Sequence, residues 1–69
     1  MKDLHSRLLS AHEHDDHEEL IVLYTEAADQ SNDVIKESFF LTHAFVFALE
    51  AGDVRADGLR DRLHGMGRI

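Results

Sequence analysis

The segment that most constrains the fold is the uncharged run from Ser38 to Leu49, SFFLTHAFVFAL, provided that its histidine is neutral. Four phenylalanines (Phe39, Phe40, Phe45, Phe47) would point to every side of a helix formed there. A helix in so short a protein normally has one apolar stripe and one polar, solvent-exposed face. This segment therefore predicts a central helix that is covered on several sides, in part by a partner chain.

The size of the chain limits how it can be stabilised. Its 69 residues predict one helical domain, residues 1–69, close to the lower size limit for a self-sufficient core. Small domains usually add disulfides, a metal or a second chain. Because the sequence has no cysteine, disulfides and thiolate sites are excluded. Association with a protein partner, or a metal site built from histidine and carboxylate, are the two options that remain.

The charge balance excludes several classes of partner. Seven basic against 14 acidic residues give a formal net charge of −7. We therefore expect no nucleic acid and no anionic membrane surface as partners, because both require a basic footprint. The N-terminal segment lacks the continuous apolar core of a signal peptide, and the phenylalanine-rich run is too short to span a bilayer. A cytoplasmic protein is the expectation.

Helical spacing and capping residues predict four helices. Their approximate ranges are 2–11, 16–28, 34–51 and 54–64. Asp15 or Asp16 is expected to cap the second helix. The segment 29–33, DQSND, reads as a turn, and the cap of the third helix is left open between its last three residues, Ser31, Asn32 and Asp33.

Glycine and aspartate mark the last connection. Gly52 is expected in the left-handed conformation after the third helix, and Asp53 as the cap of the fourth. Val54, Leu59 and Leu63 should point inward, while Gly58 indicates either a close helix contact or a weak helix. Short links favour antiparallel neighbours. The predicted fold class is all-α, a four-helix bundle of consecutive antiparallel helical hairpins with the third helix central.

The centre of the chain, from Leu20 to Leu63, resembles a tetratricopeptide-type helical repeat. Tyr24 and Ala27 have the spacing of the aromatic and small residues of a second repeat helix, and Leu41, Thr42 and Phe45 match the next first helix. Leu20 stands where that family prefers a small residue, Asn32 where it often has proline, and Gly52-Asp53 comes about one turn late. The resemblance implies a protein-binding scaffold without catalytic residues. We also expect no cofactor.

A histidine-rich cluster is the clearest candidate for chemistry. Its members are His12, His14 and His17, flanked by Glu13, Asp16 and Glu18. Imidazole and carboxylate bind zinc, nickel or copper, and residues three or four apart on a helix share a face. The pattern lacks the HExxH arrangement of metalloproteases. Metal binding, a pH response near the pKa of histidine and a solvated acidic link between helices all remain open.

Other polar residues have structural interpretations. His43, inside the apolar run, is expected in the core or an interface, bonded to a backbone carbonyl or to Tyr24. Arg55, Arg60 and Arg62 are expected to pair with Asp57, Asp61 or Glu50. With no nucleophile elbow and no glycine-rich phosphate loop, we predict no enzymatic activity.

The phenylalanines leave two alternatives: complete cover by the other three helices, or an exposed seam for another chain. Three short neighbours cannot easily cover a helix that is apolar all round. We therefore predict a non-enzymatic interaction module, homodimeric through the third helix, because symmetric pairs are the commonest assemblies. The expected interface residues are Phe40, Ala44, Phe47 and Ala51.

Overall fold

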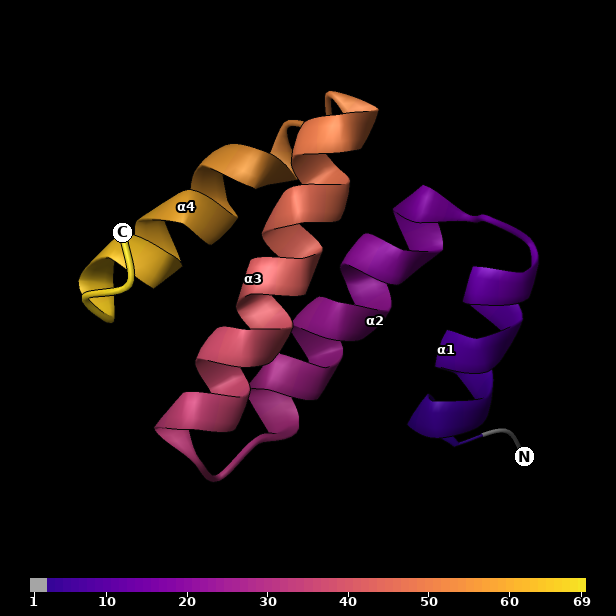
Figure 1. The fold of residues 1–69 in the computed structure, drawn as a ribbon, viewed down its shortest axis with the longest axis horizontal. Coiled ribbons are helices and arrows are strands. Elements are labelled where there is room, and N and C mark those ends of the chain that lie inside the picture. The colour runs from indigo at the N-terminus through magenta and orange to yellow at the C-terminus, as the bar shows by residue number, and fades with distance from the viewer. Residues whose placement is uncertain (1–2) are drawn as a thin grey trace.

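The computed structural model describes residues 3–69 and contains four α-helices in that range. They are α1 (Leu4–Glu13), α2 (His17–Gln30), α3 (Val34–Ala51) and α4 (Arg55–Gly65). Figure 1 shows them as consecutive hairpins joined by short links, with α3 between α2 and α4. The all-α bundle of helical hairpins is thus confirmed. Lys2, where the first helix was predicted to begin, lies outside the described residues.

Local capping explains where the helices start and stop. The Asp16 carboxylate accepts a hydrogen bond from the backbone N–H of Glu19 at 3.2 Å, and the Asp33 carboxylate accepts one from Ile35 at 2.7 Å. Asp33 is therefore the cap among the three residues left open. Gly52 has φ 63°, the left-handed conformation predicted for it after α3.

The start of α4 differs slightly from the prediction. The helix begins at Arg55, and Val54 precedes it. The N-cap position is held by Val54, which makes no side-chain cap bond, and the Asp53 carboxylate one residue earlier accepts a hydrogen bond from the backbone N–H of Arg55 at 2.8 Å. Val54 does not point inward as predicted, because 83% of it is exposed. A Cβ on Gly58 would meet no atom within 4 Å, so this glycine marks no close helix contact.

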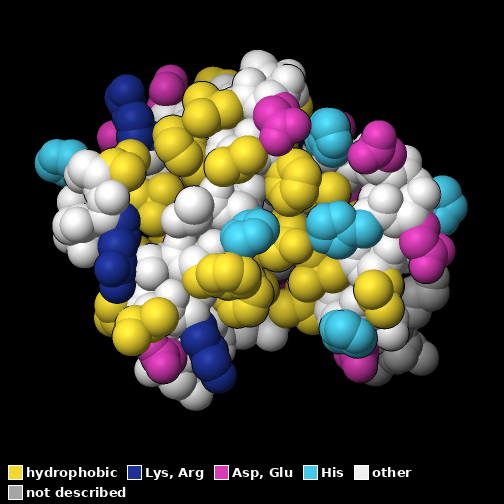
Figure 2. Space-filling view, in the orientation of Figure 1, with side chains coloured by type: hydrophobic (Ala, Val, Ile, Leu, Met, Phe, Trp, Pro, Cys, Tyr) yellow, Lys and Arg dark blue, Asp and Glu magenta, His cyan; other side chains and the backbone are white. Residues whose placement is uncertain are grey.

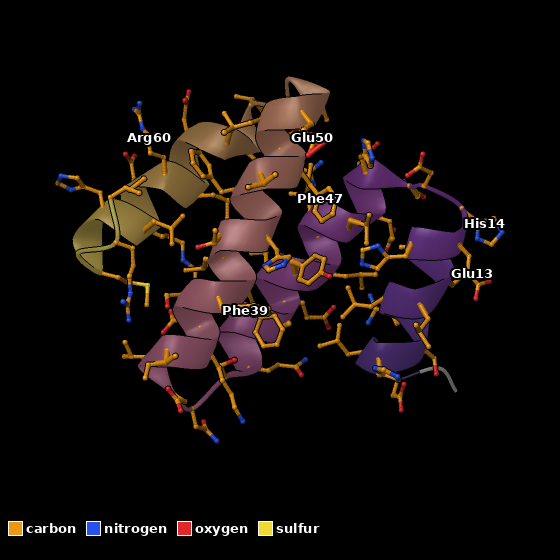
Figure 3. The ribbon with its side chains drawn as sticks, in the orientation of Figure 1. Glu13, His14, Phe39, Phe47, Glu50 and Arg60 are labelled. Atoms are coloured by element: carbon orange, nitrogen blue, oxygen red, sulfur yellow. The ribbon has the colours of Figure 1, made fainter. Side chains whose placement is uncertain are left out.

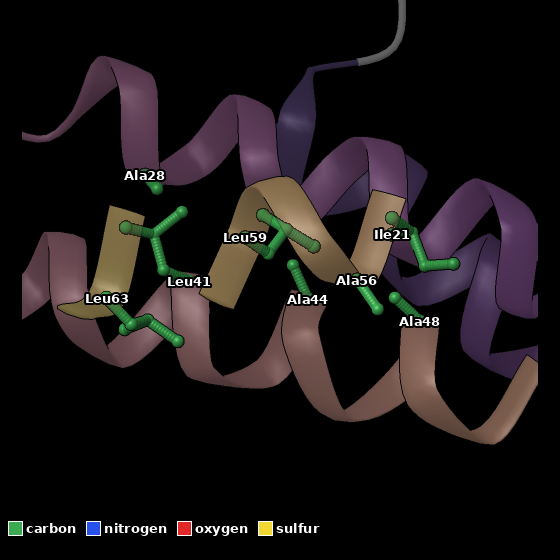
Figure 4. Close-up of a cluster of buried hydrophobic side chains, with 8 residues drawn as sticks. All are labelled: Ile21, Ala28, Leu41, Ala44, Ala48, Ala56, Leu59 and Leu63. Atoms are coloured by element: carbon green, nitrogen blue, oxygen red, sulfur yellow. The ribbon is translucent and has the colours of Figure 1, made fainter. Parts of the chain in front are cut away.

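The main core lies where α2, α3 and α4 meet (Figure 4). Small residues at Ala44, Ala48 and Ala56 let the helix backbones approach, while larger side chains fill the space between them: Ile21, Leu41, Leu59 and Leu63. A second cluster, Ala11, Leu20 and Leu23, joins α1 to α2. α3 therefore has α2 and α4 as its backbone neighbours, whereas α1 packs mainly on α2.

Ion pairs connect α4 to α2, to α3 and to the preceding turn, but with partners other than those predicted. Arg62 lies 2.8 Å from the Asp29 carboxylate and 3.5 Å from that of Glu37. Arg55 lies 2.7 Å from Asp53 and 4.0 Å from Glu18. The predicted pairing along the surface of α4 was wrong, because the two arginines face α2 and the preceding turn. Within the range that the structure covers, no helix is long and apolar enough to cross a membrane.

Candidate functional site

An exposed apolar strip runs along α3 on the side away from the core. Its large residues are Ile35, Phe39, Val46 and Leu49, which are 70%, 56%, 44% and 57% exposed. Exposed Thr42 completes the 4-3-4-3 spacing, and we call these five residues the α3 stripe. Figure 2 shows hydrophobic side chains gathered over α3 on one face of the molecule. Because exposed apolar side chains gather along one side of α3, this strip is the candidate interaction surface.

The helical period places this strip roughly opposite the buried face of α3. Leu41, Ala44 and Ala48 each have no exposed surface and form that buried face. At 3.6 residues per turn, positions 35, 39, 42, 46 and 49 fall on the far side of the same helix. The uncharged run thus has two apolar sides. One side fills the core of this chain, and the other is exposed to solvent.

The predicted interface residues do not form one exposed seam. Ala44 is fully buried, so it is unavailable to a partner, and this part of the prediction was wrong. Phe40 and Phe47 are half-buried and pack against the core, and exposed Ala51 is the last residue of α3. Sequence reasoning missed Ile35, Val46 and Leu49, and it left Phe39 out of the interface. The steps of four and three could not identify them, because the buried residues Leu41, Ala44 and Ala48 follow the same spacing.

Phe47 belongs to a cluster of rings that joins three helices. Its ring centroid lies 5.8 Å from that of Tyr24 in α2, 6.0 Å from His12 in α1 and 5.7 Å from His17. Figure 3 shows Phe47 pointing toward α2 and Phe39 lying nearer the other end of α3. Phe47 therefore has a structural role in this chain, and α1 reaches α3 through these rings.

His43 connects this ring cluster to the α3 stripe. Its Nδ1 lies 2.9 Å from the carbonyl oxygen of Phe39, which can only accept, so Nδ1 donates the hydrogen bond. The imidazole packs 4.4 Å from the ring of Phe39 and stacks 5.2 Å from that of Tyr24. The predicted bond to a backbone carbonyl is confirmed. A hollow of about 220 Å³ beside it is lined by Thr42, His43, Val46, Phe47 and Glu50.

Two opposite charges flank the α3 stripe on the side of His43. Lys36 follows Ile35 near the start of α3, and Glu50 follows Leu49 near its end. Both side chains are exposed, and neither makes an ion pair with any residue between 3 and 69. Figure 3 shows Glu50 near the C-terminal end of α3. The strip therefore carries a positive flank at one end and a negative flank at the other.

The three histidines of the predicted metal cluster have separate partners. His12 Nε2 lies 2.9 Å from the Tyr24 hydroxyl, and His14 Nδ1 donates to the Ser10 carbonyl at 2.7 Å. His17 Nε2 lies 3.5 Å from an Asp15 carboxylate oxygen. Among the described residues, no group of three or more His, Asp or Glu side chains is arranged to hold a metal ion. The structure does not bring His12, His14 and His17 together.

The strongest perturbation of a titratable group lies away from this face. Two hydrogen bonds from the Arg55 side chain, helped by one from its backbone N–H, lower the pKa of Asp53 to about 2. This carboxylate stabilises the turn between α3 and α4 through its hydrogen bonds to Arg55. Comparison with known proteins identifies no relative, because no family model, no curated protein and no solved structure matches the chain.

Proposed function

We propose that this protein is a small, non-enzymatic protein–protein interaction module that pairs with a second copy of itself through α3. The observation that carries the proposal is the α3 stripe, in which four large apolar side chains are each 44–70% exposed. Burial of apolar surface is the main favourable term in association, at about 25 cal/mol per Å². The likeness to tetratricopeptide helices in residues 20–63 supports a binding role as well.

The remaining parts of the proposal follow from composition and local geometry. The net charge of −7 argues against nucleic acid and anionic membranes as partners. A non-enzymatic role is supported by His12 and His43, which are bonded to a tyrosine and to a backbone carbonyl rather than to a nucleophile. We also propose a cytoplasmic location, with which the lack of cysteine is compatible.

Sedimentation velocity from micromolar to millimolar concentration tests the homodimer. The wild-type chain should shift from monomer to dimer, and Phe39→Asp should remain monomeric because it places a charge inside the interface. Leu9→Asp is the matched control, since Leu9 is also about half exposed but lies on α1. Phe47→Asp is unsuitable, because it would disrupt the ring cluster within one chain.

The result can overturn the proposal in two ways. A wild-type chain that stays monomeric at millimolar concentration would exclude the homodimer. A Phe39→Asp variant that dimerises as well as the wild type would exclude the α3 stripe as the interface. Circular dichroism of both aspartate variants checks that the helices are retained.

Calorimetric titration with zinc and nickel separates this proposal from the alternative of a metal-binding accessory protein. The separate partners of His12, His14 and His17 lead us to expect no micromolar binding. Micromolar affinity that is lost in His14→Ala/His17→Ala would instead favour the metal-binding alternative.

A further inference from the structure

We propose that two copies of the chain pair antiparallel through α3, with Phe39 packed against Leu49 of the second copy and Lys36 paired with Glu50 of the second copy. This inference rests on the proposed function and adds the direction, the register and the charge pairs of the interface. It follows from the spacing of the α3 stripe, from the charges on its flank and from the shape of the molecule.

The spacing of the stripe is that of a helix–helix seam. Apolar residues in alternating steps of four and three keep one strip of a helix facing a neighbouring helix along its length. The stripe follows these steps from Ile35 through Phe39 and Thr42 to Val46 and Leu49, interrupted only by the threonine. Four of the five residues are large and apolar, so the seam extends over most of the 18 residues of α3.

A two-fold axis near the middle of α3 brings complementary layers together. In an antiparallel pair, a residue that follows a step of four in the stripe (Phe39 or Val46) meets a residue of the other helix that follows a step of three (Thr42 or Leu49). Phe39 then lies beside Leu49 of the second copy, and Thr42 lies beside Val46 of the second copy. Symmetry repeats both layers on the other side of the axis, as in any two-fold symmetric pair. The largest side chain in the seam thereby meets another large one, and the smaller residues meet at the centre.

The flanking charges favour this direction over the parallel one. Lys36, His43 and Glu50 are spaced seven residues apart and follow one edge of the seam. An antiparallel pair brings each Lys36 to a Glu50 of the other copy, once at each end. A parallel pair would place both lysines at one end and both glutamates at the other. Only the antiparallel arrangement pairs the charges that have no partner among residues 3–69.

The shape of the monomer is consistent with a face-to-face pair. The described chain measures 34 × 29 × 13 Å along its principal axes, so it is a flat body. Domains generally consist of two packed layers around one core, and a second copy would supply such a layer over the exposed side of α3. A standard interface buries about 800 Å² per partner with about 20–30 residues on each side, whereas the α3 stripe has five residues, so we expect a weak dimer.

Charge reversal tests the register. Lys36→Glu and Glu50→Lys should each weaken self-association about tenfold in low salt, because each change turns two attractive pairs into repulsive ones. The double variant Lys36→Glu/Glu50→Lys should return to within about threefold of wild type, since it restores both pairs in reverse. An equimolar mixture of the two single variants should form a heterodimer that is tighter than either homodimer.

Two controls change the net charge equally at exposed positions away from α3. Arg60→Glu on α4 matches Lys36→Glu, and Glu13→Lys on α1 matches Glu50→Lys. Sedimentation equilibrium measures every dimer constant, and circular dichroism verifies the fold of each variant. Both controls should associate within about twofold of wild type, because surface charges distant from an interface are screened.

The outcomes separate the register from the proposed function. If Phe39→Asp abolishes the dimer but the charge variants bind as tightly as wild type, the antiparallel register is wrong and the interaction module stands. Weakening by single reversals without rescue in the double variant also overturns the register. If Phe39→Asp leaves the dimer intact, or the wild-type chain never dimerises, the proposed function itself fails.

Discussion

The Nε2 atom of His12 lies 2.9 Å from the hydroxyl oxygen of Tyr24 and so links α1 directly to α2. The two rings meet edge to face, with centroids 5.9 Å apart, and the Tyr24 ring also stacks with Phe47 of α3. α1 also packs on α2 through the small cluster of Ala11, Leu20 and Leu23. The first helix is thus held by a small apolar cluster and by two polar contacts, this one and the ion pair of Arg7 with Glu26 at 3.2 Å.

Tyr24→Phe should separate the hydrogen bond from the packing of the ring. We expect a loss of about 0.5–1 kcal/mol in the free energy of unfolding, because the bond is partly exposed and the phenyl ring keeps its neighbours. Urea unfolding measures this difference. Tyr24→Ala serves as the comparison and should lose clearly more, since it also removes the ring stacking with His43 and Phe47. A Tyr24→Phe variant as stable as wild type would contradict a contribution from the hydrogen bond, and equal losses in the two variants would contradict one from the ring stacking.

Ala44→Leu and Ala51→Leu distinguish the buried from the exposed side of α3. Ala44 lies in the main core and has no exposed surface, so the extra carbons should cost about 1–3 kcal/mol. Ala51 is exposed at the end of the helix, and the same change there should stay within about 0.5 kcal/mol. Thermal unfolding compares the two variants with wild type. A stable Ala44→Leu protein would mean that this side of α3 is not packed as described.

Asp53 should contribute a pH-dependent part of the stability. Arg55 lowers the pKa of its carboxyl from 3.8 to about 2 in the folded chain. A lowered carboxyl pKa adds stability that is fully present above about pH 4 and is lost as the pH falls toward 2. Asp53→Asn should therefore lower the midpoint of thermal unfolding at neutral pH. The difference from wild type should shrink between pH 4 and 2, and a difference independent of pH would exclude this ion pair as the cause.

Two glycines should respond to alanine in opposite directions. Gly58 lies inside α4 with open space around the position of a Cβ, so Gly58→Ala should stabilise the chain by about 0.5–1 kcal/mol. Gly52 also has space, but its φ of 63° is one that L-residues rarely adopt, so Gly52→Ala should destabilise. Urea unfolding of the two variants provides the test. A destabilising Gly58→Ala change would contradict the open space described around Gly58.

The four helices and most of their ends could be predicted because the signals lie within a few residues of each boundary. Asp16 and Asp33 cap the helices that follow them, and Gly52 takes the left-handed conformation that ends α3. Each of these depends on the chain within one turn, so no knowledge of distant contacts is needed. The same holds for the bond from His43 to the carbonyl of Phe39, which spans a single turn of α3.

The orientation of α3 could not be read from its residues. A segment that is apolar on every side has no polar face to indicate which positions meet the core. Only the packing of α2 and α4 decides that Ala44 is buried and that Phe39 is exposed. The same packing turns Arg62 toward Asp29 rather than toward its own helix. By itself, then, the amino-acid sequence determined where the helices lie, because capping and spacing act locally. The tertiary structure alone decided which side of α3 remains open, because that choice depends on helices that are distant in sequence.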